Sequence, residues 1–150
     1  MRVPLITLSD GHTIPQVGLG LWKNKDEQQF KTAFETGITA GYRHFDSAQE
    51  YHNEQFLGEA WRASGKKRGE LFITTKISPR NFRYQKVHSS FKESLDRLQT
   101  DYVDLLLLHF PVTILRKKAW KALEEIHHNG SARSIGVSNY MIRHLEAMKH

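Results

Sequence analysis

The chain has 150 residues, with 22 lysines and arginines against 16 aspartates and glutamates, which gives a formal charge of +6. This length suits one domain, and the hydrophobic (39%) and charged (25%) fractions exclude wholesale disorder. Cysteine is absent, which excludes disulfides, thiolate metal sites and a cysteine nucleophile. No apolar run approaches the ~20 residues of a membrane-spanning helix, and Met1 to Pro15 lack a signal-peptide stretch. We therefore expect a cytoplasmic protein with no membrane partner.

Nucleic acid and metal ions are disfavoured as ligands. The densest basic runs, residues 66–68 and 116–118, do not alternate with aromatic residues as a single-strand binding groove requires. We interpret both runs as solvated helix faces, with attraction of an anion as the alternative. His127 and His128 are adjacent on a predicted helix and point apart, so they make poor joint metal ligands. We expect no nucleic-acid partner and no metal.

The N-terminal segment has the pattern of a β-hairpin. Residues 5–8 and 12–14 flank Asp10-Gly11, and this dipeptide favours a tight turn. After the hairpin, short runs of β-forming residues predict strands over residues 17–21, 42–45, 71–75, 103–108 and 133–137.

Helical periodicity fills the segments between these strands. It predicts helices over residues 26–40, 53–64, 85–98 and 114–128. After the last strand, Asn139 is a candidate cap of a further helix, with Ile142, Leu145 and Met148 facing inward.

Five strand-then-helix units therefore follow the hairpin. Strands alternate strictly with helices, and the strands are apolar, as the four leucines at 105–108 show. This pattern indicates a parallel sheet that is buried on both faces and has helices outside. A doubly wound sheet and a (β/α)8 barrel both agree with this pattern. No linker, repeat or change of composition divides the chain, so we expect no internal domain boundary.

Polar residues come directly after the strands. Asp46 follows the second, with Tyr51 soon after it, and Lys76 and His109 follow the third and the fourth. Because the carboxyl ends of parallel strands meet at one face, where ligands bind, these side chains should converge. Any one of them fits a turn cap or an exposed strand end, but the succession favours a shared site.

The set makes chemical sense as a proton donor. A phenol is a sluggish acid at neutral pH, and a lysine ammonium beside it stabilises the phenolate. A carboxylate next to the lysine would hold it charged and in place, while a neutral histidine could orient a carbonyl oxygen. Such a donor is what the alkoxide formed on carbonyl reduction requires. No side chain donates hydride, so a cofactor must supply it.

The sequence resembles the aldo-keto reductases at four places. Residues 41–54 (GYRHFDSAQEYHNE) resemble the first signature of the family, and 72–76 (FITTK) resemble the segment with its catalytic lysine. Residues 105–111 (LLLLHFP) resemble the segment with its histidine, and 134–140 (SIGVSNY) the strand that holds the nicotinamide amide. The resemblance covers essentially the whole chain. The loop after His109 is most similar in length to the smaller bacterial-type members, such as diketogluconate and glyoxal reductases.

The resemblance implies an α/β fold, the (β/α)8 TIM-barrel type with an N-terminal β-hairpin, of which this chain supplies about the first five units. Residues 1–150 would then be the N-terminal portion of a single barrel domain. The resemblance also implies a monomeric oxidoreductase that uses NADPH to reduce a small aldehyde or ketone to an alcohol.

Four residues carry catalytic roles by resemblance. Tyr51 would be the proton donor, Lys76 would tune it, Asp46 would support Lys76, and His109 would position the substrate. These positions match the family pattern, apart from Ser47, which stands where threonine is usual.

Cofactor and substrate contacts are also implied by the resemblance. Ser138 and Asn139 would bind the nicotinamide carboxamide, while Trp22 and Phe110 would line the substrate pocket together with the histidine. Phe110 stands where tryptophan is common, and Ser78 where an aromatic residue often sits, so the pocket departs from the family pattern.

A complete barrel takes about 250 residues. The later units of the family, which stack on nicotinamide and bind the 2′-phosphate, have no counterpart in this chain, so the preference for NADPH rests on the resemblance alone. An open five-stranded sheet has two unpaired edges, and we expect the chain alone to be marginally stable and to bind cofactor weakly. The alternative function is that of a catalytically inactive, truncated barrel remnant that acts through self-association.

Overall fold

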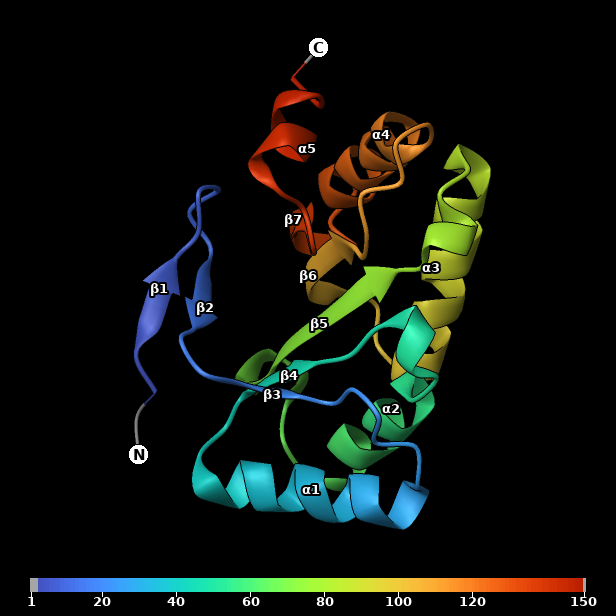
Figure 1. Cartoon of the computed structure of the whole chain (residues 1–150). Coiled ribbons are helices and arrows are strands. Elements are labelled where there is room, and N and C mark those ends of the chain that lie inside the picture. Colours follow the sequence, from blue (N-terminus) through green and yellow to red (C-terminus); the bar gives the residue numbers. More distant parts are fainter. Residues whose placement is uncertain (1–2, 150) are drawn as a thin grey trace.

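A computed structural model describes residues 3–149 of the chain, beginning with a separate hairpin. Strands β1 (Leu5–Thr7) and β2 (Thr13–Pro15) pair antiparallel as a two-stranded sheet. The turn between them places Gly11 at a φ of 89°, a conformation that glycine adopts without strain. The predicted hairpin is therefore confirmed (Figure 1).

The second sheet has five parallel strands that neighbour one another in chain order (Figure 1). They are β3 (Gly18–Gly20), β4 (His44–Asp46), β5 (Phe72–Ile77), β6 (Val103–Leu108) and β7 (Ala132–Val137). Each strand is followed by a helix, in order α1 (Glu27–Ala40), α2 (Glu54–Ala63), α3 (Tyr84–Leu98), α4 (Arg116–His128) and α5 (Ile142–Glu146).

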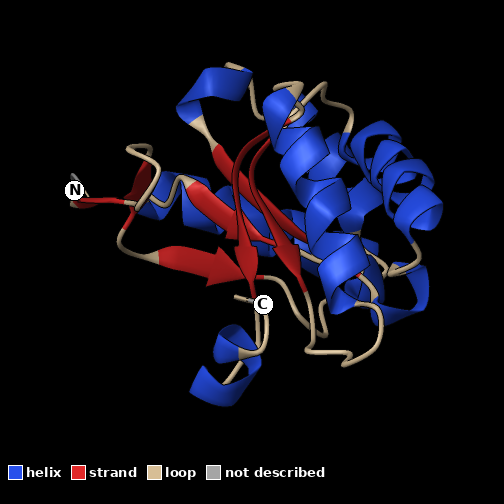
Figure 2. Cartoon of the chain, turned by 90° about the horizontal axis from the view of Figure 1, so that it is seen from above, coloured by secondary structure: helices blue, strands red, loops and turns tan. Residues whose placement is uncertain are grey.

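The strand order decides between the two architectures that the sequence left open. A doubly wound sheet reverses its strand order at a switch point, whereas here every crossover advances in the same direction. Right-handed crossovers in one direction place the helices on one face of the sheet. Figures 1 and 2 show α1 to α4 along the outer side of a curved sheet, and successive helices pack on one another. The five βα units of a barrel-type fold are thus confirmed.

The core lies between this sheet and its helices. Phe30 and Phe34 of α1 are fully buried, and the Phe34 ring meets that of Phe45 on β4 with centroids 4.4 Å apart. Each such side chain contributes roughly 1.5–3 kcal/mol through burial. On β6, Leu106 is fully buried but Leu107 only partly, so the predicted burial on both faces is complete on the helix side only.

Caps set the limits of the first helix. The Asp26 carboxylate accepts the N–H of Gln29 at 2.8 Å, and Gly41 ends the helix with a φ of 98°. Across residues 3–149, no helix combines the length and the apolar character that crossing a bilayer demands.

The prediction for the last helix is wrong in two respects. Its N-cap is Met141, whereas Asn139 lies outside the helix with a φ of 62°. Ile142 and Leu145, expected to face inward, are 74% and 45% exposed. Periodicity identifies the apolar face of a helix but not whether another element covers it.

The start of α4 also differs from the prediction. The helix begins at Arg116 rather than at residue 114, and Ile114 is 88% exposed in the preceding loop. Arg116 itself is only 7% exposed, so the basic run at 116–118 is not a uniformly solvated face.

Candidate active site

The two charged residues of the predicted site lie within the strand ends rather than after them. Asp46 is the last residue of β4, where it pairs with Gly20 and Thr74, and Lys76 pairs with Leu107 near the end of β5. The strands extend one or two residues further than predicted because the parallel ladder continues through these polar positions. Both backbones are therefore fixed by hydrogen bonds at the carboxyl edge of the sheet.

Lys76 is the centre of the site. Its ammonium donates hydrogen bonds to Asp46 Oδ1 at 2.6 Å, to the Ser47 carbonyl at 2.9 Å and to the Tyr51 hydroxyl at 3.3 Å. The residue is only 5% exposed, and these three contacts match the three donors of an ammonium group. The structure thus brings together the phenol, the amine and the carboxylate that the sequence predicted to converge.

His109 also contacts the tyrosine. It follows β6, is 6% exposed, and its ring meets that of Tyr51 edge-to-face at 5.6 Å between centroids. Burial lowers the pKa of His109 below its ordinary 6.5, and the Lys76 charge lowers it further against the opposite effects of Glu50 and Asp46. The imidazole is therefore neutral at pH 7. Its buried Nδ1 has no hydrogen-bond partner within residues 3–149.

The predicted cofactor residues are tied to this histidine. Asn139 donates from Nδ2 to the His109 carbonyl at 2.9 Å and to Ser138 Oγ at 3.1 Å. Ser138 in turn donates its backbone N–H to Leu108 at 2.8 Å. The exposed Asn139 amide and the Ser138 hydroxyl thus lie at the edge where β6 and β7 end.

The two predicted pocket residues differ in their surroundings. Phe110 stacks on the His109 ring with centroids 4.6 Å apart. Trp22 follows β3 at the same edge of the sheet, because the Leu21 N–H bonds the Asp46 carbonyl at 3.0 Å. Its side chain is 65% exposed and carries the Lys23 ammonium over the ring at 4.5 Å from the centroid.

Sequence reasoning missed a supporting role of Asn53. This fully buried side chain accepts the Ser47 hydroxyl at 2.8 Å and donates to the carbonyls of Leu21 at 2.8 Å and Asn24 at 3.0 Å. It thereby joins the loop after β3 to the residue whose carbonyl holds Lys76. In sequence, an asparagine before a helix suggests a cap, yet this side chain makes no capping bond.

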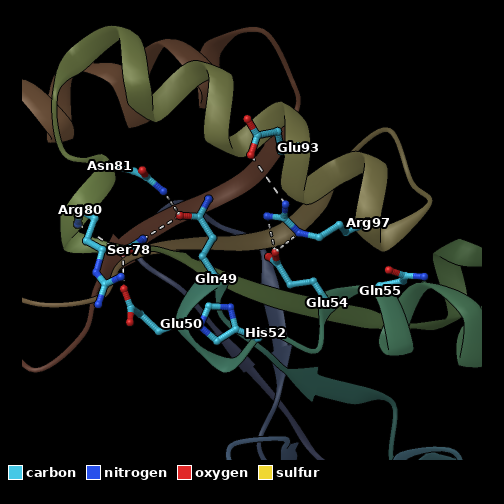
Figure 3. Close-up of a pocket in the computed structure, with 10 residues that line it drawn as sticks. All are labelled: Gln49, Glu50, His52, Glu54, Gln55, Ser78, Arg80, Asn81, Glu93 and Arg97. Atoms are coloured by element: carbon cyan, nitrogen blue, oxygen red, sulfur yellow. Dashed lines mark hydrogen bonds and ion pairs between the residues drawn. The ribbon is translucent and has the colours of Figure 1, made fainter. Parts of the chain in front are cut away.

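A second missed residue, Gln49, holds the turn that carries Tyr51. That turn is a short 3-10 helix, Gln49–Tyr51. The Gln49 amide donates to the Ser90 carbonyl at 3.1 Å. Its oxygen accepts Ser78 N–H at 2.8 Å and Asn81 Nδ2 at 2.9 Å (Figure 3). Nothing in the sequence distinguishes this glutamine from a surface residue.

Glu54 is a buried carboxylate at the start of α2. It is 2% exposed and accepts hydrogen bonds from Thr75 Oγ1 at 2.5 Å and Ser94 Oγ at 3.2 Å. It also accepts one from Arg97 Nε at 2.9 Å (Figure 3). It therefore joins α2 to α3 and to the residue next to Lys76. From sequence, an acidic residue in a first helical turn reads as a surface group that favours the helix dipole.

The neighbouring cleft does not contain the site. A cleft of about 370 Å³ between the Tyr51 turn and α3 contains none of the four catalytic candidates (Figure 3). It is lined by Gln49, Glu50, His52, Glu54, Gln55, Ser78, Arg80, Asn81, Glu93 and Arg97. No group of three or more histidine and carboxylate side chains within residues 3–149 is arranged to hold a metal ion.

Comparison with known proteins finds relatives that are named as reductases. The chain is 40% identical over 146 residues to methylglyoxal reductase DkgA of Escherichia coli O157:H7, covering 96% of the chain and 52% of that protein. It is 38% identical over 143 residues to glyoxal reductase of Bacillus subtilis strain 168, covering 95% and 52%. The crystal structure of a Bombyx mori aldo-keto reductase in complex with NADP superposes with a TM-score of 0.92 at 34% identity, covering 99% of this chain and 54% of that one.

The chain thus spans about half the length of the curated relatives it matches. The resemblance to small bacterial-type reductases is confirmed by these relatives. The model of the Aldo/keto reductase family matches residues 16–150, which include the five-stranded sheet and the complete site around Lys76. This chain therefore belongs to the aldo/keto reductase family.

Proposed function

We propose that this chain carries the catalytic groups of an NADPH-dependent reductase that converts aldehydes or ketones into alcohols. The observation that carries the proposal is the Lys76 ammonium, which contacts Asp46 Oδ1 at 2.6 Å and the Tyr51 hydroxyl at 3.3 Å in a buried position. A lysine ammonium beside a phenol stabilises the phenolate and so lowers the free-energy cost of removing the phenolic proton. General acid catalysis by such a phenol increases the rate ~10²–10⁴-fold.

The side chains take distinct roles in this proposal. Tyr51 gives its hydroxyl proton to the carbonyl oxygen, and Lys76 stabilises the phenolate that remains. Asp46 keeps the ammonium charged and in place. Neutral His109, whose buried Nδ1 has no hydrogen-bond partner within the described residues, orients the carbonyl oxygen, and Phe110 fixes the imidazole plane by stacking.

The residues at the end of β7 fit a nicotinamide. The Ser138 hydroxyl and the exposed Asn139 amide offer donors and acceptors for a carboxamide, one strand away from His109. When bound, the cofactor supplies the hydride that no side chain can donate. NADPH is proposed because the Bombyx mori relative is described in complex with NADP. The expected cytoplasmic location belongs to the same proposal.

The test is oxidation of NADPH in the presence of methylglyoxal and other small aldehydes, since two relatives are named for such substrates. The chain is assayed alone and within the longest product of its gene. Tyr51→Phe should reduce the rate ~10²–10⁴-fold. Tyr102→Phe is the matched control, because Tyr102 stacks with Arg68 and Arg133 outside the site. Equal rates for Tyr51→Phe and the unaltered protein would refute the mechanism.

A second candidate function is self-association without catalysis. Within the described sheet, β3 and β7 are each paired on one side only, and unpaired edges invite pairing with another chain. Exposed Ile114, before α4, and Ile142, in α5, add apolar surface. Sedimentation of the chain distinguishes the two: a stable oligomer that never oxidises NADPH favours this candidate, and an active monomer excludes it.

A further inference from the structure

The Gln49 side chain ties its own turn to two other elements of the fold. Its oxygen accepts the Ser78 N–H at 2.8 Å and Asn81 Nδ2 at 2.9 Å (Figure 3). Its nitrogen donates to the Ser90 carbonyl at 3.1 Å and to Ser94 Oγ at 3.0 Å. A side-chain amide has two acceptor lone pairs and two N–H donors, so these four bonds fill its capacity. The residue is only 9% exposed, so water does not compete for them.

Two of the four partners follow the strand that carries Lys76. Ser78 comes directly after β5, and Asn81 ends the short 3-10 helix Pro79–Asn81. The other two partners are buried serines that lie one turn apart on α3, the helix that packs on β5. Gln49 therefore fixes its turn against both the lysine strand and the helix behind that strand.

The turn itself has few internal bonds to hold its shape. The Tyr51 N–H bonds the Ala48 carbonyl at 3.0 Å, and the His52 N–H bonds the Gln49 carbonyl at 3.4 Å. His52, which ends the turn, has a φ of 56°. This left-handed conformation is strained for a residue with a side chain and persists only where the surrounding structure enforces it. The orientation of the turn thus depends on its contacts with other elements.

The phenol that the turn carries is held weakly at its tip. Within residues 3–149 the Tyr51 hydroxyl bonds Lys76 Nζ alone, at 3.3 Å, whereas the ammonium contacts its other two acceptors at 2.6 and 2.9 Å. Hydrogen bonds weaken steeply beyond about 3.5 Å, so a small displacement of the turn would break this contact. One further side-chain bond joins the turn to the lysine segment, from the Ser78 hydroxyl to the Glu50 carboxylate.

We propose that Gln49 is a positioning residue that holds the Tyr51 phenol against the Lys76 ammonium. It acts through the turn and contacts neither of these two side chains in the bonds described above. Its effect on rate rests on the proposed function, whereas its effect on the contact does not. A misplacement of about 1 Å can cost ~10²-fold in rate. Loss of Gln49 should therefore lower kcat, while KM changes little because the residues assigned to substrate binding are retained.

The contact is tested first, in the full chain without substrate or cofactor, through the ¹³C NMR signals of tyrosine Cζ. Tyr51→Phe identifies the Tyr51 signal among the five tyrosines, and Lys76→Met shows how it shifts when the contact is lost. Gln49→Leu, which keeps a similar size but has no polar atoms, should shift the signal in the same direction. The matched control is Gln55→Leu, because exposed Gln55 bonds only Glu59 among the described residues, and the signal should stay in place.

The rate is tested next, with methylglyoxal and NADPH and within the longest product of the gene. Gln49→Leu should lower kcat between about 10- and 100-fold. KM should change by less than about twofold, and Gln55→Leu should alter neither constant. A residue that merely stabilises the fold would lower the fraction of folded molecules, but would leave both the Tyr51 signal of the folded molecules and their KM and kcat unchanged.

A milder variant guards against misfolding of Gln49→Leu. Asn81→Ala removes one donor to the Gln49 oxygen from a partly exposed residue, and should shift the Tyr51 signal in the same direction by a smaller amount. An unmoved signal in either variant, or an equal shift in Gln55→Leu, would overturn the proposal whatever the activity. Shifted signals in a protein that Tyr51→Phe leaves fully active would support the positioning role and refute the proposed function instead.

Discussion

Lys76 and Tyr51 meet although 25 residues separate them: the Lys76 ammonium lies 3.3 Å from the Tyr51 hydroxyl and 4.8 Å from the centroid of its ring. Each partner is held by a different part of the fold. The lysine lies within the hydrogen-bonded ladder of β5, and the tyrosine ends a turn whose first residue, Gln49, is bonded to α3 and to the segment after β5. The two side chains are thus positioned by the scaffold before any ligand binds.

The ion pair beside this contact should contribute to stability. Asp46→Asn leaves the buried Lys76 ammonium without its carboxylate. We expect a loss of about 1–3 kcal/mol in the free energy of unfolding, below the cost for a fully buried pair because the Asp46 side chain is 32% exposed. Urea denaturation of the variant and the unaltered chain measures the difference.

The control for this experiment is an exposed pair. Glu93 contacts Arg97 at 3.7 Å with its side chain 67% exposed, so Glu93→Gln should cost less than about 0.5 kcal/mol. Combining Asp46→Asn with Lys76→Met completes a double-mutant cycle, and a coupling of about 0.5–3 kcal/mol is expected. A cost for Asp46→Asn no greater than that for Glu93→Gln would show that the pair does not stabilise the fold.

Glu54 should matter more than its place in the sequence suggests. Glu54→Gln keeps the shape but removes the charge that three donors contact, including Arg97. We expect a loss of about 1–3 kcal/mol in the free energy of unfolding. Glu59→Gln on the exposed face of the same helix, where Gln55 is its partner, should stay within about 0.5 kcal/mol. Equal melting temperatures for the two variants would contradict this role.

The fold was predictable because its signals are local and periodic. Alternation of apolar strands with amphipathic helices predicted five βα units, and the Asp10-Gly11 turn predicted the hairpin. The convergence of Lys76 and Tyr51 followed from one rule, that parallel strands share a carboxyl edge. The predicted ends of β4 and β5 fall one and two residues short, because the backbone hydrogen bonds of a parallel sheet form whether or not the side chain is polar.

Contacts between distant polar residues could not be predicted in this way. Asn53 and Gln49 bond to backbone groups that are brought near them only by the folded chain. The inward face expected for Ile142 failed for a related reason, since an apolar stripe does not reveal what covers it. Arg116 was interpreted as part of a solvated run because a charged triplet carries no information on which member is buried.

Gly58 tests whether packing outweighs helix propensity. In an exposed helix, Gly→Ala stabilises by about 1 kcal/mol. At Gly58 of α2 an added Cβ would lie 2.2 Å from the Arg97 carbonyl oxygen, which is backbone at the end of α3 and cannot move aside. Overpacking of this kind costs about 1–3 kcal/mol or more, so Gly58→Ala should destabilise the chain.

The matched control for Gly58 is Gly69. An added Cβ there meets nothing within 4 Å, so Gly69→Ala should change the free energy of unfolding by less than about 0.5 kcal/mol. Thermal and urea unfolding of the two variants provide the comparison. If Gly58→Ala proves as stable as Gly69→Ala, the close approach of α2 to α3 described here is wrong.

Stability should fall in mild acid because the fold lowers the pKa values of three histidines, His44, His109 and the more exposed His144, and the first two are the more deeply buried. Burial lowers the pKa values of His44 and His109 below their ordinary 6.5, and Lys76 adds to the effect at both. Below about pH 6.5 the unfolded chain therefore binds protons that the folded chain resists, and protonation favours unfolding. The free energy of unfolding should be constant above this pH and decline below it, until the pH passes the lowered values. Urea denaturation from about pH 8 to about pH 5 measures how the free energy of unfolding changes with pH. The double variant His44→Gln/His109→Gln should flatten this dependence. The exposed His128→Gln is the control and should leave it unchanged. Stability that rises on acidification through this range would mean that the two imidazoles are not held neutral.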